Sequence, residues 1–495
     1  MENLYQSTRG DQERIPASRA ILNGIAKDGG LYVPLTLPKF DRPVREYAGR
    51  SYRENAFDIL RLFLTDYSDE ELHRCVDAAY DGKFDTAEIA PLTEAAGAHY
   101  LELWHGPTIA FKDMALSLLP HLMTTAAEKN GVTEETVILT ATSGDTGKAA
   151  LAGFADVKGT RIMVFYPKHG VSPIQERQMV TQTGDNTCVV GIEGNFDDAQ
   201  TGVKRIFTDA AMNRELADAG FRFSSANSIN IGRLVPQIVY YVHSYGKLLE
   251  EGRIRDGEAV NFVVPTGNFG NILAAYYAMQ MGLPVNRLIC ASNENRVLYD
   301  FFGTGTYDRN REFILTSSPS MDILISSNLE RLIYHIAGND AGTDAALMSR
   351  LLSEGKYEIT DAMRRNLSMF VGGFATEEET AAEIARVFEE AHYLIDTHTA
   401  VASAVYRRYR EQSGDDTVTV IASTASPFKF TRAVAGAIGI ETEGADDFAL
   451  AEKLSDAAGV PIPAAVTSLR TAQVKHDRVC ATEEMAQAVR DFLKV

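Results

Sequence analysis

The residue with the clearest potential for chemistry is Lys112, in a loop between a predicted strand and a predicted helix. Residues 105–113 contain a Gly-Pro turn, and helical character is expected to begin near Asp113. The neighbouring Phe111 makes the surroundings partly apolar. Desolvation lowers the pKa of a lysine and frees its amine to attack an aldehyde. The alternative, which this segment alone favours, is a surface lysine paired with Asp113.

A glycine-rich segment over 265–271 follows a predicted strand and precedes a predicted helix. This arrangement directs free N–H groups and a helix N-terminus at one point, which favours an anion. Gly267 and Gly270 would let the backbone approach a phosphate closely. The segment is neither a Walker loop nor a GxGxxG motif. A plain strand–helix turn is the alternative.

A second segment, 141–148, also joins a strand to a helix and ends in Gly147-Lys148. It is not a P-loop, because Thr142 stands where the first glycine belongs and Ala149 replaces the Mg²⁺-binding hydroxyl. Nucleotide hydrolysis is therefore rejected. A helix N-terminus with three hydroxyls is suited to a carboxylate. Helix capping by Thr142 or Ser143 is compatible with that role.

From residue 100 onwards, short β-rich runs alternate with helical patterns. Such alternation predicts an α/β fold of parallel sheets, with ligands outside the carboxyl ends of the strands. The predicted strands are 101–103, 137–140, 161–166, 188–190, 262–264, 288–291 and 417–421. Residues 54–80 and most of 300–400 show helical spacing, and Thr376 is the expected N-cap of a helix over 377–390.

Composition limits the possible partners. A chain of 495 residues is too long to fold around one hydrophobic core, so two or three domains are expected. A net charge of −19 disfavours binding to nucleic acid and to anionic membranes. No apolar run reaches the length of a membrane span, and the N-terminus lacks the apolar region of a signal peptide. The four cysteines have no metal-ligand spacing, so we expect no metal site and reduced thiols in a cytoplasmic protein.

Twelve stretches, spread over nearly the whole chain, resemble the threonine synthase family in its longer form. They are 7–10, 28–34, 105–108, 110–113, 141–147, 166–168, 171–176, 193–198, 227–230, 265–270 and 396–400 with 423–425. The resemblance implies the tryptophan synthase β-like fold, known as fold type II, with pyridoxal phosphate as cofactor. It divides the chain into an N-terminal domain over 1–95, a large cofactor domain over 96–135 and 226–495, and a smaller mobile domain over 136–225.

The resemblance also implies roles for particular residues. Lys112 matches the Schiff-base lysine, and Thr424 matches the hydroxyl that bonds the pyridine nitrogen. The cup for the cofactor phosphate is matched by Gly267, Asn268, Phe269, Gly270 and Asn271. The site for the substrate carboxylate is matched by Ser143, Gly144, Asp145 and Thr146. The site for the substrate phosphate is matched by Asn227, Ser228 and Arg233.

The activity implied is conversion of O-phospho-L-homoserine and water to L-threonine and phosphate, by γ-elimination and β-hydration. A phospholyase or dehydratase that gives a 2-keto acid is the alternative. The expected assembly is a monomer or a homodimer. Two motifs depart from the family's pattern: residues 426–430 read Ser-Pro-Phe-Lys-Phe in place of His-Pro-Ala-Lys-Phe, and Thr397 replaces a proline. For the adjacent His398, a structural role and a role in the site both stay open.

Overall fold

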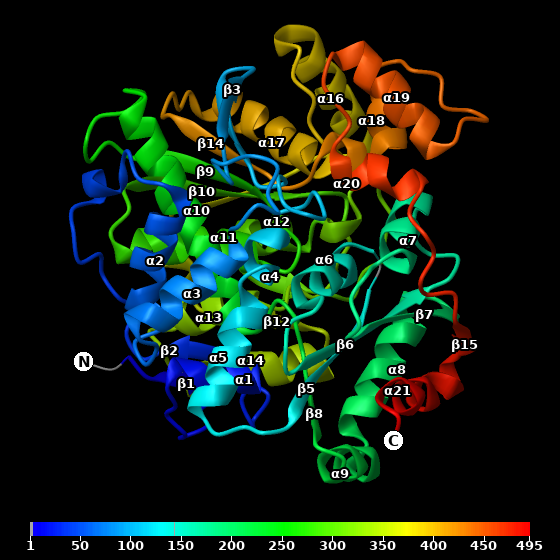
Figure 1. The fold of residues 1–495 in the computed structure, drawn as a ribbon. Coiled ribbons are helices and arrows are strands. Elements are labelled where there is room, and N and C mark those ends of the chain that lie inside the picture. Colours follow the sequence, from blue (N-terminus) through cyan, green and yellow to red (C-terminus); the bar gives the residue numbers. More distant parts are fainter. Residues whose placement is uncertain (1–2, 143) are drawn as a thin grey trace.

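The computed structural model describes residues 3–142 and 144–495, and its strands form two parallel-rich sheets flanked by helices (Figure 1). The predicted α/β class is therefore confirmed. All seven predicted strands are present, because each carries a β-rich apolar run that the sheets bury. Within the described residues, no helix is long and apolar enough to cross a membrane.

The first sheet has the strand order β13-β10-β9-β14-β4-β3, and only the β3–β4 pair is antiparallel. Its strands are β3 (Leu92–Ala95), β4 (Ala98–Glu102), β9 (Val260–Pro265), β10 (Val285–Ser292), β13 (Phe370–Phe374) and β14 (Thr419–Ser423). Strand β14 pairs with both β4 and β9, so the carboxyl ends of these three strands meet at one edge. The loops that begin there hold three of the predicted site segments.

Helices cover both faces of the first sheet (Figure 1). Helix α11 (Gly270–Met281) is buried almost all round, as expected for a helix without a polar face. Helix α16 begins at the predicted N-cap, Thr376, which forms a capping box with Glu379. The other helices of this region are α4 (Asp113–Leu116), α10 (Ile231–Glu250), α12 (Val297–Thr304), α13 (Leu329–Ile336), α14 (Ala341–Ser353), α15 (Asp361–Arg365), α16 (Glu377–Ala391), α17 (Thr397–Ser413), α18 (Thr431–Ala437), α19 (Asp447–Ala458) and α20 (Ala464–Thr467).

The second sheet is parallel throughout, with the strand order β15-β7-β6-β5-β8. Its strands are β5 (Glu135–Ala141), β6 (Thr160–Pro167), β7 (Thr187–Glu193), β8 (Phe221–Ser224) and β15 (Val479–Ala481). Its helices are α6 (Asp145–Phe154), α7 (Pro173–Val180), α8 (Phe196–Thr208), α9 (Ala210–Asp218) and α21 (Met485–Leu493). Strand β5 leads into the loop before α6, which brings the second glycine-containing segment to the same region as the first.

The N-terminal part of the chain packs on the first sheet's helices, through contacts of α1 with α5 and of α2 with α10. Its helices fall where the spacing over 54–80 predicts them. Serine capping boxes begin both α2 and α3, at Ser51 and Ser68. Its elements are β1 (Tyr5–Ser7), α1 (Ala17–Asn23), β2 (Tyr32–Pro34), α2 (Tyr52–Phe63) and α3 (Asp69–Ala79), whereas α5 (Leu119–Lys129) is one of the helices on which it packs.

The C-terminus departs from the predicted division of the chain. Figure 1 shows the red segment leaving α20 and running down to β15 and α21, beside α8. Strand β15 pairs with β7, so it extends the sheet of residues 136–225. Residues 226–495 therefore do not form one unit, because the last strand and helix cover an edge and an apolar face of the second sheet.

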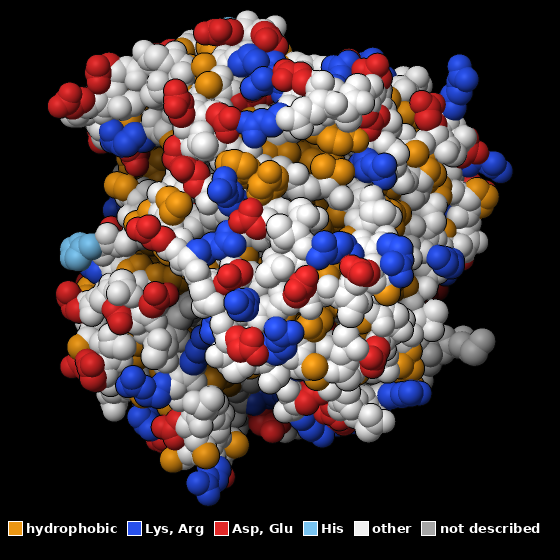
Figure 2. Space-filling model, turned by 180° about the vertical axis from the view of Figure 1, so that it is seen from behind, with side chains coloured by type: hydrophobic (Ala, Val, Ile, Leu, Met, Phe, Trp, Pro, Cys, Tyr) orange, Lys and Arg blue, Asp and Glu red, His pale blue; other side chains and the backbone are white. Residues whose placement is uncertain are grey.

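Acidic and basic side chains are interspersed over the face shown in Figure 2. The net charge of −19 is thus not gathered into a single acidic patch on that face. A local basic pocket inside such a molecule is compatible with an acidic whole.

Candidate active site

A cavity of about 200 Å³ lies where the carboxyl ends of strands from both sheets converge. It brings together the following predicted site residues: Lys112, Asp145, Thr146, Asn227, Ser228, Arg233, Gly267, Asn268, Phe269, Gly270, Asn271 and Thr424. Gly144 does not line the cavity but immediately precedes α6. Ser143 lies outside the described residues. The cavity thus joins segments that are more than 300 residues apart in the sequence.

The loop of Lys112 is fixed against the segment that follows β14. The Phe111 N–H donates to the Thr424 carbonyl over 2.8 Å, and the Ser426 N–H donates to the Ile109 carbonyl over 3.0 Å. Ile109 has a left-handed φ of +53°. A non-glycine residue in that region costs free energy, so the surrounding hydrogen bonds must impose the turn. These contacts fix Lys112 next to Thr424.

The surface-lysine alternative for Lys112 is wrong. Its side chain is only 10% exposed, and Asp113 is not its partner. Asp113 instead accepts hydrogen bonds from the Thr108 N–H (2.8 Å) and the Thr108 hydroxyl (2.6 Å). Burial lowers the pKa of the Lys112 amine, Asp145 raises it in part, and two further cations lower it again.

Ser320 bridges Lys112 and Asp145. The Lys112 Nζ donates to Ser320 Oγ over 2.9 Å, and Ser320 Oγ donates to Asp145 Oδ2 over 2.9 Å. The direct distance from Lys112 Nζ to Asp145 Oδ2 is longer, at 3.5 Å. The hydroxyl therefore offers a route for a proton between the amine and the carboxylate.

The other oxygen of Asp145 faces a second buried lysine. Lys429 Nζ lies 3.2 Å from Asp145 Oδ1 and donates to the Thr108 carbonyl over 2.9 Å. Burial raises the pKa of the Asp145 carboxyl, but nearby positive charge, that of Lys429 foremost, lowers it far below its ordinary range. Asp145 is thus an ionised carboxylate, whose charge would repel a substrate carboxylate.

The first glycine-rich loop presents unused donors to the cavity. Within the described residues, the backbone N–H groups of 267–271 make no hydrogen bond. They surround the N-terminus of α11, where the helix dipole favours an anion. Asn271 Oδ1 accepts from the Tyr240 and Tyr241 hydroxyls, both over 2.6 Å. This leaves the buried Asn271 Nδ2 without a partner among the described residues.

Gly267 is required for a reason that the sequence did not reveal. A Cβ at this position would lie 2.4 Å from the Ser320 carbonyl oxygen. The glycine therefore allows the 3-10 helix Pro319–Met321 to approach the loop, which places Ser320 beside Lys112.

Arg233, in the first turn of α10, is a buried cation without a carboxylate partner in the described part of the chain. Its Nη1 donates to the Ala226 carbonyl over 2.9 Å, and its Nε makes no hydrogen bond to a described residue. Burial lowers its pKa to about 10, at which it still carries its charge at neutral pH. An unpaired buried guanidinium that lines a cavity is suited to bind an anion.

The N-terminus of α6 is capped from the strand side, as predicted for Thr142. The Thr142 hydroxyl accepts from the N–H groups of Gly144 and Gly147, each over 3.0 Å. Gly144 has a φ of +135°, a conformation that other residues rarely adopt. The N–H groups of Asp145 and Thr146 make no hydrogen bond to a described residue. They are the groups that a carboxylate in the cavity would reach.

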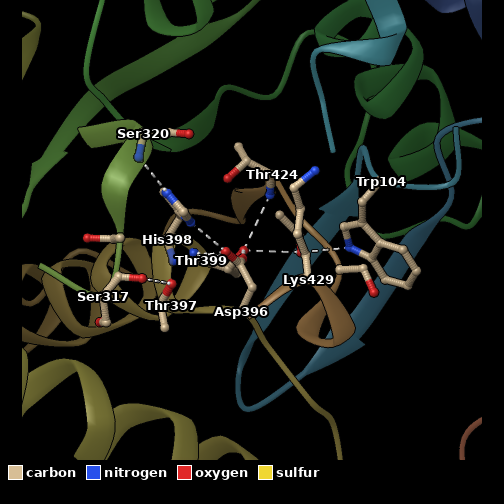
Figure 3. A network of polar contacts seen from close by, with 12 residues as sticks. Trp104, Ser317, Ser320, Asp396, Thr397, His398, Thr399, Thr424 and Lys429 are labelled. Carbon is tan, nitrogen blue, oxygen red and sulfur yellow. Dashed lines mark hydrogen bonds and ion pairs between the residues drawn. The ribbon is translucent and has the colours of Figure 1, made fainter. Parts of the chain in front are cut away.

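His398 lines the cavity and belongs to the hydrogen-bond network shown in Figure 3. Its Nε2 accepts from the Ser320 N–H over 3.2 Å, so the ring proton lies on Nδ1, which donates to Asp396 Oδ2 over 2.8 Å. Asp396 also caps α17 and holds Thr399, whose hydroxyl accepts from the Thr424 N–H. His398 therefore has a structural role as an acceptor that positions Ser320.

Three residues that contact Lys112 or Asp145, namely Ser320, Lys429 and Gln175, were not predicted as site residues from the sequence. Ser320 lies in an irregular segment that shows neither a strand pattern nor a glycine-rich turn. Lys429 was noticed only as part of an altered motif. The one local signal for Lys429 was a lysine between two phenylalanines soon after a strand's carboxyl end.

The described residues contain no group of three His, Cys, Asp or Glu side chains that would hold a metal ion. All four cysteines are free thiols, and three of them are buried. The cavity offers amines, hydroxyls, backbone N–H groups, the Asp145 carboxylate, the Arg233 guanidinium and the His398 imidazole.

Three family models match the chain, and the second and third matches overlap over residues 399–424. The model described as "Threonine synthase N terminus" matches residues 4–80, and "Pyridoxal-phosphate dependent enzyme" matches residues 90–424. The model "Threonine synthase, C-terminal" matches residues 399–480. The second model covers more than half of the chain and contains the whole cavity apart from Ala425.

Individual relatives agree with these matches. Threonine synthase of Schizosaccharomyces pombe is 38% identical over 465 residues, which covers 87% of this chain and 88% of that protein. Human threonine synthase-like 1 is 40% identical over 437 residues. That match covers 86% of this chain but only 58% of the human protein, which is the longer of the two.

Solved structures share the fold over its full length. The crystal structure of PLP-bound threonine synthase from Brucella melitensis has a TM-score of 0.89 and 36% identity, and covers 100% of both chains. Yeast threonine synthase has a TM-score of 0.89 and 32% identity, with 100% of this chain covered and 99% of the yeast chain. The predicted fold type is thereby confirmed. The chain belongs to the threonine synthase family of pyridoxal-phosphate-dependent enzymes.

Proposed function

We propose that this protein is a threonine synthase, which converts O-phospho-L-homoserine and water to L-threonine and phosphate with pyridoxal phosphate bound at Lys112. One observation carries the proposal: a buried lysine amine lies in a cavity with two separate anion-binding groups. One is the loop 267–271 with its unused N–H groups, and the other is the unpaired Arg233. A phosphorylated cofactor and a phosphorylated substrate require two such groups.

The described residues fit the cofactor. The N–H groups of 267–271 and the orphaned Asn271 Nδ2 would bind its phosphate, and the Lys112 amine would bind its aldehyde carbon. Thr424, which lines the cavity, would offer a neutral hydroxyl to the ring nitrogen, and such a partner would leave that nitrogen largely unprotonated. When bound, the cofactor supplies a mild electron sink that stabilises negative charge on the substrate carbons.

The substrate would be held at both of its anionic ends. Arg233, with Asn227 and Ser228 beside it, binds the phosphate group. The N–H groups of Asp145 and Thr146, at the N-terminus of α6, bind the carboxylate. The charged side chain of Asp145 takes no part in that contact, because it is turned towards the two lysines.

The proton transfers fall to Lys112. With its amine free, Lys112 would remove and return protons at the substrate's Cα and Cβ. Ser320 keeps the amine oriented and connects it to Asp145. Arg233 stabilises the phosphate that leaves from Cγ, and this phosphate then assists the water that adds at Cβ.

The assay with O-phospho-L-homoserine tests the proposal. The purified protein, loaded with pyridoxal phosphate, should release phosphate and threonine in equal amounts. Release of 2-oxobutyrate in place of threonine would instead identify a phospholyase or a dehydratase. The absence of any turnover, together with a failure to take up the cofactor, would contradict the proposed enzyme altogether.

Three broader features belong to the same proposal. The sheet of residues 136–225 moves as a smaller domain that closes over the substrate and excludes water until hydration. The protein works as a monomer or a homodimer. It works in the cytoplasm, a reducing compartment that suits its four free thiols.

A further inference from the structure

The Asp145 carboxylate is shared between two lysines in unequal ways. Lys429 Nζ lies 3.2 Å from Oδ1, an oxygen that also accepts from Gln175 Nε2 over 3.0 Å. Lys112 Nζ lies 3.5 Å from Oδ2, and the Ser320 hydroxyl takes the 2.9 Å position on that oxygen. Lys429 thus makes the closer ion pair, and Lys112 is coupled mainly through a neutral hydroxyl.

The two lysines also differ in their surroundings. The Lys429 side chain is completely buried, and its ammonium has two acceptors, the Thr108 carbonyl and Asp145. The Lys112 side chain is 10% exposed and lines the cavity, where its hydrogen bond to Ser320 requires only a neutral amine. Two acceptors within 3.2 Å, one of them charged, stabilise a buried ammonium better than a hydroxyl at 2.9 Å and a carboxylate at 3.5 Å do.

The charges that face Lys112 come from every element packed around it. Asp145 is on α6, Lys429 is on the 3-10 helix Pro427–Lys429, Arg233 is on α10 and His398 is on α17. If Lys112 were protonated, its ammonium would lie near two further buried cations, Lys429 and Arg233, with Asp145 as its nearest carboxylate. A second buried carboxyl, Asp113 on α4, and Lys148 on α6 face Lys429 instead. An arginine does not lose its proton. The excess positive charge can therefore be reduced only if a lysine is deprotonated. The burial of Lys112 and the cations around it act in that direction.

We infer that Lys429 is a positioning residue that serves as the permanent counter-ion of Asp145 and thereby leaves Lys112 as a neutral amine. The inference rests on the proposed role of Lys112. A neutral amine has the lone pair needed to form a C–N bond with an aldehyde carbon, with the carbonyl oxygen leaving as water. Without Lys429, Asp145 would pair with Lys112 and hold its proton.

The ionisation of Lys112 can be measured directly by competitive acetylation. The full-length chain is freed of cofactor and acetylated over a range of pH, and the extent of modification at each lysine is read by mass spectrometry. In the wild-type protein, the midpoint for Lys112 should lie below that of exposed lysines in the same digest. In Lys429→Met it should rise by about one pH unit or more, because an opposite charge nearby shifts a pKa by about 1–3 units. The charge-conserving Lys429→Arg should leave it in place.

A second readout is the rate at which the cofactor-free protein takes up pyridoxal phosphate. At pH 7 this rate should fall about tenfold in Lys429→Met and recover at higher pH, because each pH unit changes the neutral fraction tenfold. If Lys429→Met does not fold, Lys429→Gln retains a donor for Thr108 without the charge, and the same shift is expected.

The inference would be overturned if the midpoint for Lys112 were unchanged or lower in a folded Lys429→Met or Lys429→Gln variant. A wild-type Lys112 that titrates like the exposed lysines would overturn it as well. Failure of the proposed function is separable from both results. If pyridoxal phosphate never attaches to Lys112, the acetylation profile still reports whether Lys429 controls its charge.

Discussion

Arg233 and Arg331 are both buried arginines, but their surroundings are opposite. The guanidinium of Arg331 is satisfied by the Tyr32 carbonyl (3.0 Å), Asn328 Oδ1 (2.5 Å) and the Ile229 carbonyl (2.6 Å). Arg233 makes one such bond and leaves Nε orphaned. A buried ion without partners costs stability. Arg331 is therefore a structural cation, and Arg233 is held ready for a ligand.

Arg233→Gln should raise the KM for O-phospho-L-homoserine about 100-fold, because a charged hydrogen bond to phosphate contributes about 1.5–3 kcal/mol. Cofactor absorbance should be unaffected, and the melting temperature should not fall. Steady-state kinetics, absorbance and thermal unfolding check these points, with Arg331→Gln as the control that should unfold more easily. Loss of the cofactor with an unchanged KM would instead indicate that Arg233 binds the cofactor phosphate.

At the scale of elements, a buried carboxyl joins α14 to α13. Asp344 is fully buried, and its two carboxylate oxygens have no hydrogen-bond partner among the described residues. Burial and the negative charge of Glu330, opposed in part by Arg9, raise its pKa to about 9. Glu330 is itself paired with Arg9 over 2.7 Å. Asp344 is therefore a neutral acid in the folded protein at neutral pH.

This makes stability depend on pH. Between about pH 4 and pH 9 the folded protein retains a proton that the unfolded chain releases, so the free energy of unfolding falls as the pH rises. Asp344→Asn, which resembles the neutral acid, should stabilise the protein by about 2 kcal/mol at pH 8. Urea unfolding at pH 5 and pH 8 checks this. An equal effect at both pH values would refute a protonated Asp344.

The elements that carry the site were largely predictable from sequence, because their signals are local. Strands β5 and β9 are apolar runs that lead into loops containing glycines, and parallel strands place their carboxyl ends together. Ser320 was not predictable, because its position depends on packing against Gly267, 53 residues earlier. Lys429 was missed for a similar reason: a buried lysine and a surface lysine look alike until Asp145 is placed.

At the scale of the whole molecule, strand β15 likewise could not be predicted from the sequence. It has only three residues, and its partner β7 lies almost 290 residues earlier in the chain. Helix α21 then buries Met485, Ala488, Val489 and Leu493 in the apolar cluster of the second sheet. The C-terminus thus completes a unit that begins at β5, and it ties the two sheets together.

Deletion of residues 479–495 should therefore destabilise the second sheet selectively. The loss of the buried apolar side chains of α21 costs on the order of 5 kcal/mol, and β7 becomes an open edge. Hydrogen exchange should show lost protection in β5, β6 and β7 but not in β9, β10 and β14. Deletion of only 494–495 is the control. Equal loss of protection in both sheets would contradict an independent second unit.

The central claim, that Lys112 binds the cofactor, is tested most directly by borohydride reduction of the loaded protein followed by peptide mass spectrometry. The account predicts a single pyridoxyl group on the peptide that contains Lys112, and no visible absorbance in Lys112→Ala. Lys429 is the internal comparison, since it lies in the same cluster around Asp145. A pyridoxyl group on Lys429 or on another lysine, or none at all, would contradict the account.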